Sequence, residues 1–290
     1  MAMLPYDDRD GFIWFNGKLV PWREAKVHFL THTLHYGGGV FEGIRAYGGK
    51  IFKLKEHSER LLDGCKIMDM KIAYTQDDIS NACLEAVKAN KITDGYIRPL
   101  AWRGAEQMGV SGQLTKINLA VAAWEWPSYF SPEAREKGIS IKTSRWRRPP
   151  PDSAPVHAKA CGLYMICTLS KHESENAGYN DSLMLDYRGR VAELTGANFF
   201  MIKNGELHTP EADCFLNGIT RRTVMDLARK NGIKVVERAI MPEELAGIDE
   251  CFATGTAAEV TPIGKIDDRV YKVGPVTRLL REQYEALVRA

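Results

Sequence analysis

The residues with the clearest chemical potential lie between Glu193 and Arg221. Glu193 is an acid at the end of a predicted strand, and Asn204-Gly205 lies between two further apolar runs, as in a type I′ hairpin. Residues 218–220 read Gly-Ile-Thr and precede apolar positions at helical spacing. Because the first turn of a helix has free N–H groups, a glycine and a hydroxyl there form a phosphate cradle. The segment therefore offers a carboxylate and an anion site, although many hairpin–helix units bind nothing.

Two other motifs give weaker signals. His28, His32 and His35 would share one face of a helix, as metal ligands do, but the glycines at 37–39 argue against a long helix. A metal site also needs further ligands and a second shell, so structural histidines are the preferred interpretation and no metal is expected. The glycines do not fit the dinucleotide-binding spacing, because Glu42 holds the sixth position. Three consecutive glycines indicate instead a turn or a close approach of two backbones.

Size and composition are those of an ordinary globular protein. The 290 residues suffice for two domains, and 44% are hydrophobic and 26% charged. A net charge of +2 gives no bulk attraction for nucleic acid or an anionic membrane, so neither is an expected partner. The six cysteines form no Cys-x-x-Cys pair. We find no signal peptide and no apolar run of about 20 residues, so the cytoplasm is the expected location.

The first half of the chain alternates hairpins, helices and strands. Asn16-Gly17 and Gly48-Gly49 each predict a hairpin, and Thr75 begins a capping box before a helix. A helix is also expected at about 55–70, with strands at 95–102 and 117–126. Residues 126–132 are rich in helix breakers and aromatics, which is typical of a linker. We expect a smaller N-terminal domain at 1–129, a linker at 130–137 and a larger C-terminal domain at 138–290, in a mixed α/β fold.

The second half continues this mixture. Strands are expected at 139–144, 181–186, 190–193 and 233–240, with helices from 158 to about 175 and from 274. Residues 145–148 form a basic–aromatic cluster, but four residues in a near-neutral chain are weak support for a nucleic-acid patch. The strand from Glu250 leads into a turn of small residues around Thr256 and Ala257. Free amides and hydroxyls there make a second candidate anion site.

Position by position, the stretch from Glu193 to Arg221 resembles the signature of class IV aminotransferases, the fold-type-IV pyridoxal-phosphate enzymes. The signature is long and has fixed residues at both ends, so it rarely matches by chance. The resemblance implies a two-domain mixed α/β fold with mixed sheets and a pseudo-barrel in the C-terminal domain. It also implies pyridoxal 5′-phosphate as cofactor, which needs a lysine for the Schiff base, a partner for its ring nitrogen and a phosphate cup.

The lysine is assigned by the resemblance, because the sequence alone does not distinguish Lys159 from lysines that are ordinary surface groups. In the family, this lysine precedes the signature glutamate by about the gap found here and has a tyrosine five residues later, as Lys159 has Tyr164. Cys161 and Leu163 depart from the glycine and asparagine frequent in relatives, which changes the local polarity. The implied cofactor-binding residues are Arg60, Lys159, Tyr164, Glu193, Leu216, Gly218, Ile219, Thr220 and Thr256.

Several of these residues also have an ordinary structural interpretation. Glu193 would keep the pyridine nitrogen protonated, but a strand-end acid more often lies in water. Arg60 would hold the phosphate through two guanidinium arms or would be an exposed helix charge. Tyr164 would hydrogen-bond the phenolic oxygen of the ring. Leu216 would pack on the ring face or simply in the core.

The first half of the chain looks like branched-chain amino acid aminotransferases and unlike D-amino acid transaminases or aminodeoxychorismate lyases. The resemblance implies an apolar pocket of aromatic side chains, with Met108 and Val110 reaching in from a neighbouring subunit. The implied substrate-binding residues are Tyr36, Phe41, Gly43, Tyr96, Arg98, Met108, Val110, Trp126, Tyr129, Thr256 and Ala257. Arg98 is the expected contact for the glutamate carboxylate, because an unpaired buried charge costs several kcal/mol. The alternative is that Arg98 pairs with an acid and only supports its strand.

The resulting hypothesis is a transaminase for L-leucine, L-isoleucine and L-valine with 2-oxoglutarate, in which Lys159 acts as acid and base in two half-reactions. Amino acids and 2-oxo acids would be its partners, and a homodimer or dimer-based hexamer with shared sites its assembly. The alternatives within the fold are a D-amino acid or (R)-amine transaminase and a lyase. A non-catalytic binding protein of the same fold is the alternative from another class, and the joint presence of Lys159, Glu193 and Arg60 argues against it.

Overall fold

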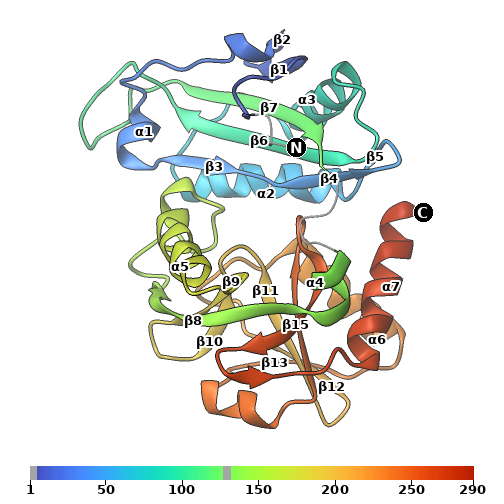
Figure 1. Ribbon diagram of the computed structural model, residues 1–290. Coiled ribbons are helices and arrows are strands. Elements are labelled where there is room, and N and C mark those ends of the chain that lie inside the picture. Colours follow the sequence, from blue (N-terminus) through green and yellow to red (C-terminus); the bar gives the residue numbers. More distant parts are fainter. Residues whose placement is uncertain (1–4, 127–131) are drawn as a thin grey trace. The chain divides into compact units, whose positions relative to one another are not determined.

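The computed structural model describes residues 5–126 and 132–290 (Figure 1). Their contacts group into two compact units. Within the described residues, the first unit comprises the chain up to residue 126 together with 158–162, and the second comprises 132–157 together with 163–290. The sequence analysis places Lys159 in the C-terminal domain, but the segment that carries it packs with the first unit, because its backbone bonds to β3 there.

The first unit is built on an antiparallel sheet. Among the described residues its strand order is β2-β1-β7-β6-β4-β5, and β3 also pairs with β6. The strands are β1 (Phe12–Phe15), β2 (Lys18–Pro21), β3 (Gly39–Phe41), β4 (Ile44–Tyr47), β5 (Lys50–Ile51), β6 (Gly95–Arg103) and β7 (Ile117–Glu125). The helices are η1 (Trp22–Glu24), α1 (His32–Tyr36), α2 (Leu54–Ile67) and α3 (Gln76–Ala89).

One face of this sheet is covered by α2 and α3. Side chains alternate between the two faces of a strand, and Leu119 and Val121 of β7 are fully buried in one cluster with Leu61 of α2 and Ile79 of α3. The intervening residue Ala120 points to the opposite face, where it lines a hollow of about 570 Å³ with other mainly apolar residues. The sheet therefore has one face in the core beneath α2 and α3 and one apolar face at the hollow, which residues of α1 also line.

The second unit is a mixed sheet that closes into a barrel. The strand order is β10-β9-β8-β15-β14-β11-β12-β13 with β16 on β15. The further pairing of β10 with β11 closes β10, β9, β8, β15, β14 and β11 into a ring, from which β12 and β13 extend. The strands are β8 (Ile139–Arg148), β9 (Asp181–Asp186), β10 (Val191–Leu194), β11 (Asn198–Lys203), β12 (Glu206–Pro210), β13 (Val235–Arg238), β14 (Glu250–Gly255), β15 (Glu259–Ile266) and β16 (Arg269–Val270). The mixed α/β class and the pseudo-barrel are thus confirmed.

Helices surround the barrel. They are α4 (Pro132–Lys137), α5 (Tyr164–Asn176) with the preceding η2 (Cys161–Leu163), α6 (Ile219–Lys230), η3 (Pro242–Gly247) and α7 (Pro275–Arg289). The apolar cluster of the barrel includes Ile139, Leu183, Phe199, Met201 and Ile263. In the part of the chain that the structure describes, no helix is both long enough and apolar enough to cross a membrane.

The local turn predictions are confirmed. Asn16-Gly17 and Asn204-Gly205 join β1 to β2 and β11 to β12, and all of these residues have the positive φ that a type I′ turn requires. Thr75 and Asp78 form the predicted capping box of α3.

Two elements differ from the prediction. The helix expected from residue 158 begins only at Tyr164, so Lys159 lies in an extended segment before it. The strand expected at 139–144 continues to Arg148, so the basic–aromatic cluster lies on a strand, with Arg145 and Arg147 exposed and Arg148 buried. The period-2 alternation of a strand explains why neighbouring arginines have different environments.

Candidate active site

In the first unit, a buried carboxylate holds the arginine predicted to bind phosphate. Glu42 directly follows β3 and is completely buried. Arg60 of α2 donates through Nε to Glu42 Oε1 at 2.6 Å and through Nη2 to Oε2 at 2.8 Å. His57 precedes Arg60 by three residues on α2, and its Nδ1 lies 2.7 Å from Glu42 Oε2. Arg60 is therefore fixed by a two-armed contact and is not simply an exposed helix charge.

Glu42 stays ionised within this cluster. Burial alone would raise the pKa of Glu42, but the Arg60 charge and the His57 hydrogen bond outweigh burial and hold that pKa well below its usual range. Burial lowers the pKa of His57, although Glu42 acts in the opposite direction. His57 is therefore neutral at pH 7, and Nδ1–H must donate because an ionised carboxylate only accepts.

Lys159 lies in the extended segment beside β3. The N–H of Phe41 donates to the carbonyl oxygen of Lys159 at 3.1 Å. The N–H of Gly162 donates to the carbonyl oxygen of Gly37, which has φ +69°, and a Cβ on Gly37 would lie 3.0 Å from the Cα of Gly162. Two backbones thus approach so closely that glycine is required, as expected for the glycine run.

The amine of Lys159 has an unusual environment within the first unit. Burial lowers the pKa of Lys159, and the Arg60 charge lowers it further, while Glu42 opposes the shift. The Nζ atom lies 4.9 Å from the centre of the Phe41 ring, and the guanidinium carbon of Arg98 lies 4.7 Å from the same centre. A lowered pKa increases the fraction of neutral amine, which is the form that attacks a carbonyl carbon.

The predicted substrate residues of the first unit meet around Tyr96. Arg98 donates to the Tyr96 hydroxyl at 3.2 Å, and the ring centres of Tyr96 and Trp126 lie 4.6 Å apart. A Cβ on Gly43 would lie only 1.9 Å from the Tyr96 oxygen, so a side chain there would displace the tyrosine. Among the described residues no carboxylate lies within ion-pair distance of Arg98, and its Nε is buried without a hydrogen-bond partner. The predicted scaffold alternative, a pair with an acid, is therefore not what the described residues form.

Three other predicted residues lie at the surface of this chain. Tyr36 is 45% exposed, Met108 is 43% exposed and Val110 is 87% exposed. Among the described residues of the first unit, none of the three contacts Tyr96 through a hydrogen bond or a ring contact. Tyr129 lies outside the described residues.

In the second unit, Glu193 is buried at the end of β10. Its Oε1 lies 3.4 Å from Nε of Arg148, and its Oε2 accepts from Nδ2 of Asn198 at 3.3 Å. Burial alone would lower the pKa of Arg148, but the Glu193 charge outweighs it, and the phenol of Tyr164 acts in the same direction as Glu193. Glu193 is therefore a buried, paired carboxylate and not a strand-end acid in water.

The predicted phosphate cradle forms at the start of α6. Gly218 is the N-cap residue, Ile219 and Thr220 are buried, and no side chain of the described residues caps the first turn. Leu216, two residues earlier, is half-buried. The amide nitrogens of this turn are therefore free of side-chain caps and suited to an anion.

The turn that carries Thr256 lies at the end of β14. A Cβ on Gly255 would lie 3.2 Å from the carbonyl oxygen of Gly196, so the end of β14 approaches the loop between β10 and β11 closely. Thr256 and Ala257 are half-buried in the following turn. The structure therefore brings this second candidate anion site to the same end of the barrel as Glu193.

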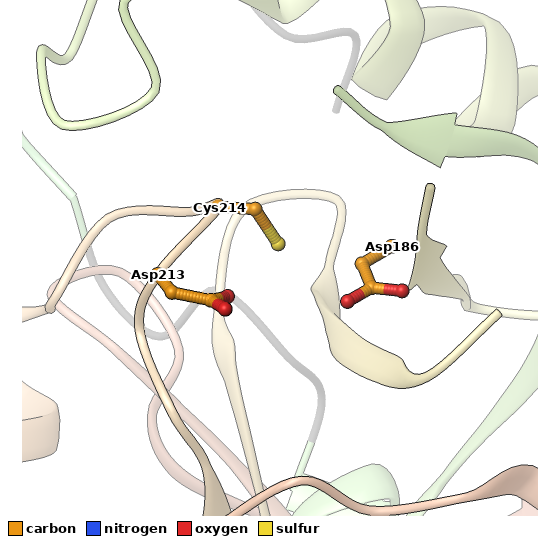
Figure 2. Close-up of side chains that lie close together, drawn as sticks. All are labelled: Asp186, Asp213 and Cys214. Carbon is orange, nitrogen blue, oxygen red and sulfur yellow. The ribbon is translucent and has the colours of Figure 1, made fainter. Parts of the chain in front are cut away.

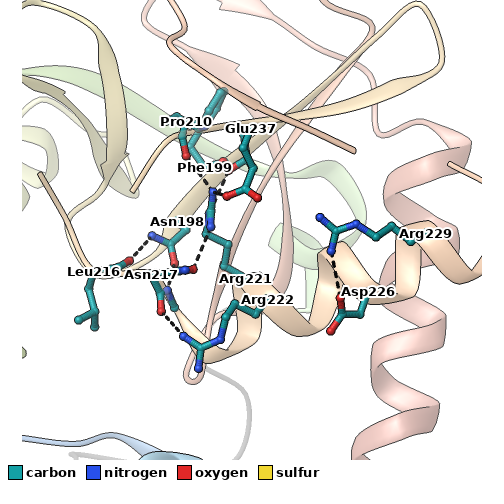
Figure 3. A network of polar contacts seen from close by, with 12 residues as sticks. Asn198, Phe199, Pro210, Leu216, Asn217, Arg221, Arg222, Asp226, Arg229 and Glu237 are labelled. Carbon is teal, nitrogen blue, oxygen red and sulfur yellow. Dashed lines mark hydrogen bonds and ion pairs between the residues drawn. The ribbon is translucent and has the colours of Figure 1, made fainter. Parts of the chain in front are cut away.

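A buried arginine fixes the first turn of α6 (Figure 3). Arg221 is completely buried and donates through Nη2 to the carbonyl oxygen of Pro210 at 2.9 Å and to Glu237 at 2.8 Å. Its Nη1 donates to Asn217 at 2.9 Å. These contacts tie the helix start to β12 and β13, so the cradle has a rigid support.

A cluster that resembles a metal site lies elsewhere in the second unit (Figure 2). The ligand atoms of Asp186, Asp213 and Cys214 lie within 4.8 Å of one another. However, Arg188 Nη2 lies 2.6 Å from both carboxylates. Burial raises the pKa of Cys214 to about 12, so its sulfur is protonated at pH 7. A cation would have to displace Arg188, so the cluster is an ion-paired structural feature.

The three histidines near the chain start each contact the backbone. His32 Nε2 lies 3.0 Å from the Gly109 carbonyl oxygen, His35 Nε2 lies 3.1 Å from the Phe29 carbonyl oxygen, and His28 Nδ1 accepts from the Leu30 N–H. The helix α1 has only five residues. These contacts support the structural interpretation of the histidines.

Sequence reasoning missed Glu42, His57, Arg148 and Asn198 as parts of these clusters. Each is a polar residue that is more than nine-tenths buried. The available signal was a charge between apolar neighbours, as for Glu42 between Phe41 and Gly43. That signal cannot identify the partner, because Glu42 and Arg60 meet only when a strand and a helix pack.

Comparison with known proteins identifies the family. Residues 39–266 match the model of amino-transferase class IV. The branched-chain-amino-acid aminotransferase of Pseudomonas aeruginosa is 45% identical over 288 residues, which cover 97% of this chain and 94% of that protein. That of Escherichia coli K12 is 39% identical over 95% and 92% of the two chains. This chain belongs to the class IV aminotransferase family.

Solved structures agree with this assignment. The branched-chain aminotransferase of the archaeon Thermoproteus uzoniensis, solved with norvaline, has a TM-score of 0.92 and 39% identity, covering 96% of this chain and 94% of that one. The Escherichia coli enzyme has a TM-score of 0.93 and 38% identity, covering 97% and 95%. The fold-type-IV architecture expected from the sequence is thereby confirmed.

Proposed function

We propose that this chain is a transaminase that transfers the amino group of L-leucine, L-isoleucine or L-valine to 2-oxoglutarate, with pyridoxal 5′-phosphate as its cofactor. The observation that carries the proposal is the half-buried Lys159, whose amine lies 4.9 Å from the centre of the Phe41 ring and has a pKa lowered by desolvation and by the Arg60 charge. The names of relatives at 39–45% identity support the substrate class.

The residues present fit this cofactor. When bound, pyridoxal phosphate supplies an aldehyde that links to amines and a ring that withdraws electrons. Lys159 would hold the aldehyde carbon, Glu193 the ring nitrogen and Tyr164 the phenolic oxygen. The phosphate would take the first-turn amides of α6 and the guanidinium of Arg60, which match its charge. Leu216 would pack on the ring face, and the hydroxyls of Thr220 and Thr256 would complete the phosphate contacts.

Lys159 would also move the proton of the reaction. Its neutral amine would take the proton from the α-carbon of the substrate as a general base, and its protonated form would then donate that proton as a general acid two atoms away, in a 1,3-proton shift. A lysine at its ordinary pKa would be almost entirely protonated at pH 7 and a poor base. The lowered pKa of Lys159 therefore serves this step as well as the attachment of the cofactor.

One pocket must accept two unlike side chains. The aromatic rings of Phe41, Tyr96 and Trp126 suit a branched apolar side chain, which gains about 25 cal/mol per Å² of buried apolar surface. The carboxylate of glutamate needs a cation, and Arg98 has no competing carboxylate among the described residues. A branched-chain amino acid aminotransferase that is 40–41% identical to this chain has been solved with 4-methylvaleric acid and with N-(5′-phosphopyridoxyl)-L-glutamate. These two ligands support one site for both substrate types.

We also propose that the chain works in the cytoplasm as a homodimer or a dimer-based hexamer with shared sites. The face of the first sheet opposite α2 and α3 carries an apolar hollow, and Phe29, Leu34 and Val110 are each more than 60% exposed. Exposed apolar surface of this kind is typical of an association surface. Met108 and Val110 would then contribute to the site of a neighbouring copy.

A donor panel tests the proposed function. The purified protein with pyridoxal phosphate would be assayed with L-leucine, L-isoleucine, L-valine, D-alanine and an (R)-amine against 2-oxoglutarate. We expect the three branched L-amino acids to give the highest kcat/KM. A preference for the D-amino acid or the amine would replace the substrate assignment. Absence of any absorption band between about 330 and 430 nm after reconstitution would refute the cofactor assignment altogether.

A further inference from the structure

The side chain of Asn198 connects the two functional parts of the second unit. Asn198 is the first residue of β11 and is 5% exposed. Its Nδ2 donates to Oε2 of Glu193 at 3.3 Å and to the carbonyl oxygen of Leu216 at 3.0 Å. Its Oδ1 accepts from the N–H of Gly218 at 3.2 Å. One buried amide thus contacts the carboxylate and both ends of the 216–218 segment that leads into α6. Figure 3 shows its contact with Leu216.

The backbone around Asn198 is fixed on both sides. Asn198 pairs with Glu193 on β10 and with Thr254 on β14. The end of β14 leads directly to Gly255 and the turn that carries Thr256. The amide is therefore held by three strands of the barrel and has little freedom to follow a displaced partner.

The contacts require the chemistry of an amide. Leu216 offers an acceptor and Gly218 a donor, so the side chain between them must both donate and accept, which asparagine does. An aspartate has the same shape but no donor, and it would put a second negative charge beside Glu193. A Cβ on Gly218 would lie 2.2 Å from Asn198 Oδ1, so the glycine leaves room for the amide.

Arg148 and Asn198 contact different oxygen atoms of the Glu193 carboxylate. Arg148 lies beside Oε1 and compensates the charge, whereas Asn198 binds Oε2 without adding charge. A carboxylate has about four lone-pair sites, so these two contacts leave capacity for another donor. The amide therefore orients Glu193 without neutralising it.

We infer that Asn198 is a positioning residue that keeps the Glu193 carboxylate and the 216–218 segment in one fixed register, so that the cofactor ring and its phosphate are bound as a unit. This inference rests on the proposed function, in which Glu193 serves the ring nitrogen and α6 serves the phosphate. Loss of the amide weakens both contacts together, because each part loses its link to the other.

The test compares cofactors with and without phosphate. Apoenzyme of wild type, Asn198→Ala, Asn198→Asp, Glu193→Gln and Asn198→Ala/Glu193→Gln would be titrated with pyridoxal phosphate and with pyridoxal, followed by the absorption band of the bound cofactor. We expect Asn198→Ala to weaken pyridoxal phosphate about tenfold or more, within the range of coupled buried contacts. The affinity for pyridoxal phosphate divided by the affinity for pyridoxal should fall about threefold or more, because the phosphate contacts are disturbed too.

The double variant identifies the coupling. If Asn198 acts through Glu193, Glu193→Gln should weaken binding far less in the Asn198→Ala background than in wild type. Independent effects that multiply, or an unchanged ratio of the two cofactors, would overturn the inference. Asn198→Asp should bind no better than Asn198→Ala, since it keeps the shape but loses the donor, and binding equal to wild type would also overturn it.

Matched controls separate positioning from loss of fold. Asn180→Ala removes another side-chain amide of the second unit, whose Oδ1 accepts from the N–H and hydroxyl of Ser140. It should leave both affinities unchanged. Should Asn198→Ala unfold, Asn198→Asp carries the same comparison of the two cofactors. Wild type that binds no pyridoxal phosphate refutes the proposed function itself, whereas normal wild-type binding with unaffected Asn198 variants refutes only the role of Asn198.

Discussion

The two units present their candidate functional groups in different ways. The first unit presents charged side chains, namely Glu42, Arg60, Lys159 and Arg98, from strands, a helix and an inserted segment. The second unit relies more on peptide groups: the first-turn amides of α6 and the turn after β14, around one buried ion pair of Glu193 with Arg148. Charged side chains can be removed by one substitution, but peptide groups cannot. The stability of the first unit should therefore depend on charge and pH, whereas in the second unit a change of charge should act mainly at the pair of Glu193 with Arg148.

The largest expected effect is the loss of Lys159. Lys159→Ala should abolish turnover and weaken cofactor binding, because the variant removes the amine that lies in the electrostatic field of Arg60 and Glu42. Borohydride reduction followed by peptide mapping should place the pyridoxyl group on Lys159. Lys66, which is exposed and paired with Asp63, provides the control variant Lys66→Ala with normal turnover. Labelling of any other lysine would contradict the assignment.

The charge dependence of the first unit is sharpest at Glu42. Glu42→Gln should lower the free energy of unfolding by about 3 kcal/mol, the low end for a broken buried pair, because the Arg60 side chain keeps 15% exposure. Urea denaturation measures this loss. Glu133→Gln breaks an exposed pair with Lys137 and should change little. If Glu42→Gln lowered the free energy of unfolding by less than Glu133→Gln, Glu42 would not be a major contributor to the stability of the first unit.

The pH dependence follows from the same residue. The pKa of folded Glu42 lies below that of the unfolded chain, which is about 4.3. Its stabilising effect is therefore complete above that unfolded value and is lost as pH falls toward the folded pKa. Wild type should lose stability below about pH 4.3 more steeply than Glu42→Gln. An equal loss of stability with falling pH in the two proteins would contradict a lowered pKa of Glu42 in the folded state.

The buried acid of the second unit should affect rate more than stability. Glu193→Gln keeps the shape and the contact with Asn198 but removes the charge. A lost charge-assisted hydrogen bond of about 1.5–3 kcal/mol corresponds to roughly one to two decades in kcat. Single-turnover kinetics and thermal unfolding separate the two effects. Turnover near wild type would remove Glu193 from the reaction and leave it a structural acid.

The smallest expected effect is selective. Arg98→Met should lower kcat/KM for glutamate and 2-oxoglutarate by about a decade, which corresponds to about 1.4 kcal/mol, while leucine changes little. The methionine keeps contact with the Phe41 ring and removes the cation. An equal loss for both substrates together with lower stability would show that Arg98 supports its strand instead.

Local sequence signals predicted much of the fold. The hairpins at Asn16-Gly17 and Asn204-Gly205 and the capping box at Thr75 depend on neighbouring residues, and the structure has all three. The start of α5 at Tyr164 could not be predicted. The backbone hydrogen bond between Phe41 and Lys159 keeps the preceding residues extended, and it joins segments that are distant in the sequence. The barrel closure between β10 and β11 likewise depends on pairing that no local pattern states.

The site residues that could be predicted from the sequence are those implied by the resemblance to the family. The structure brings Glu193 together with the start of α6, and Lys159 together with Phe41, as separate groups in the two units. The partners that hold these residues were not predictable, because Glu42, Arg148 and Asn198 have ordinary types and acquire a role only through burial and packing. The basic–aromatic cluster illustrates this limit: its arginines look alike in sequence, but the strand turns only Arg148 inward toward Glu193.

The inserted segment has a consequence for the order of synthesis. The main part of the first unit leaves the ribosome by residue 126, but the segment that completes it ends at residue 162. At 5–20 residues per second this gap corresponds to roughly 2–7 s. During that time β3 lacks the bridge that Val40 makes with Ala160 and exposes unpaired backbone. Lys159 is thus among the last residues to join the first unit, after Glu42 and Arg60 have been synthesised.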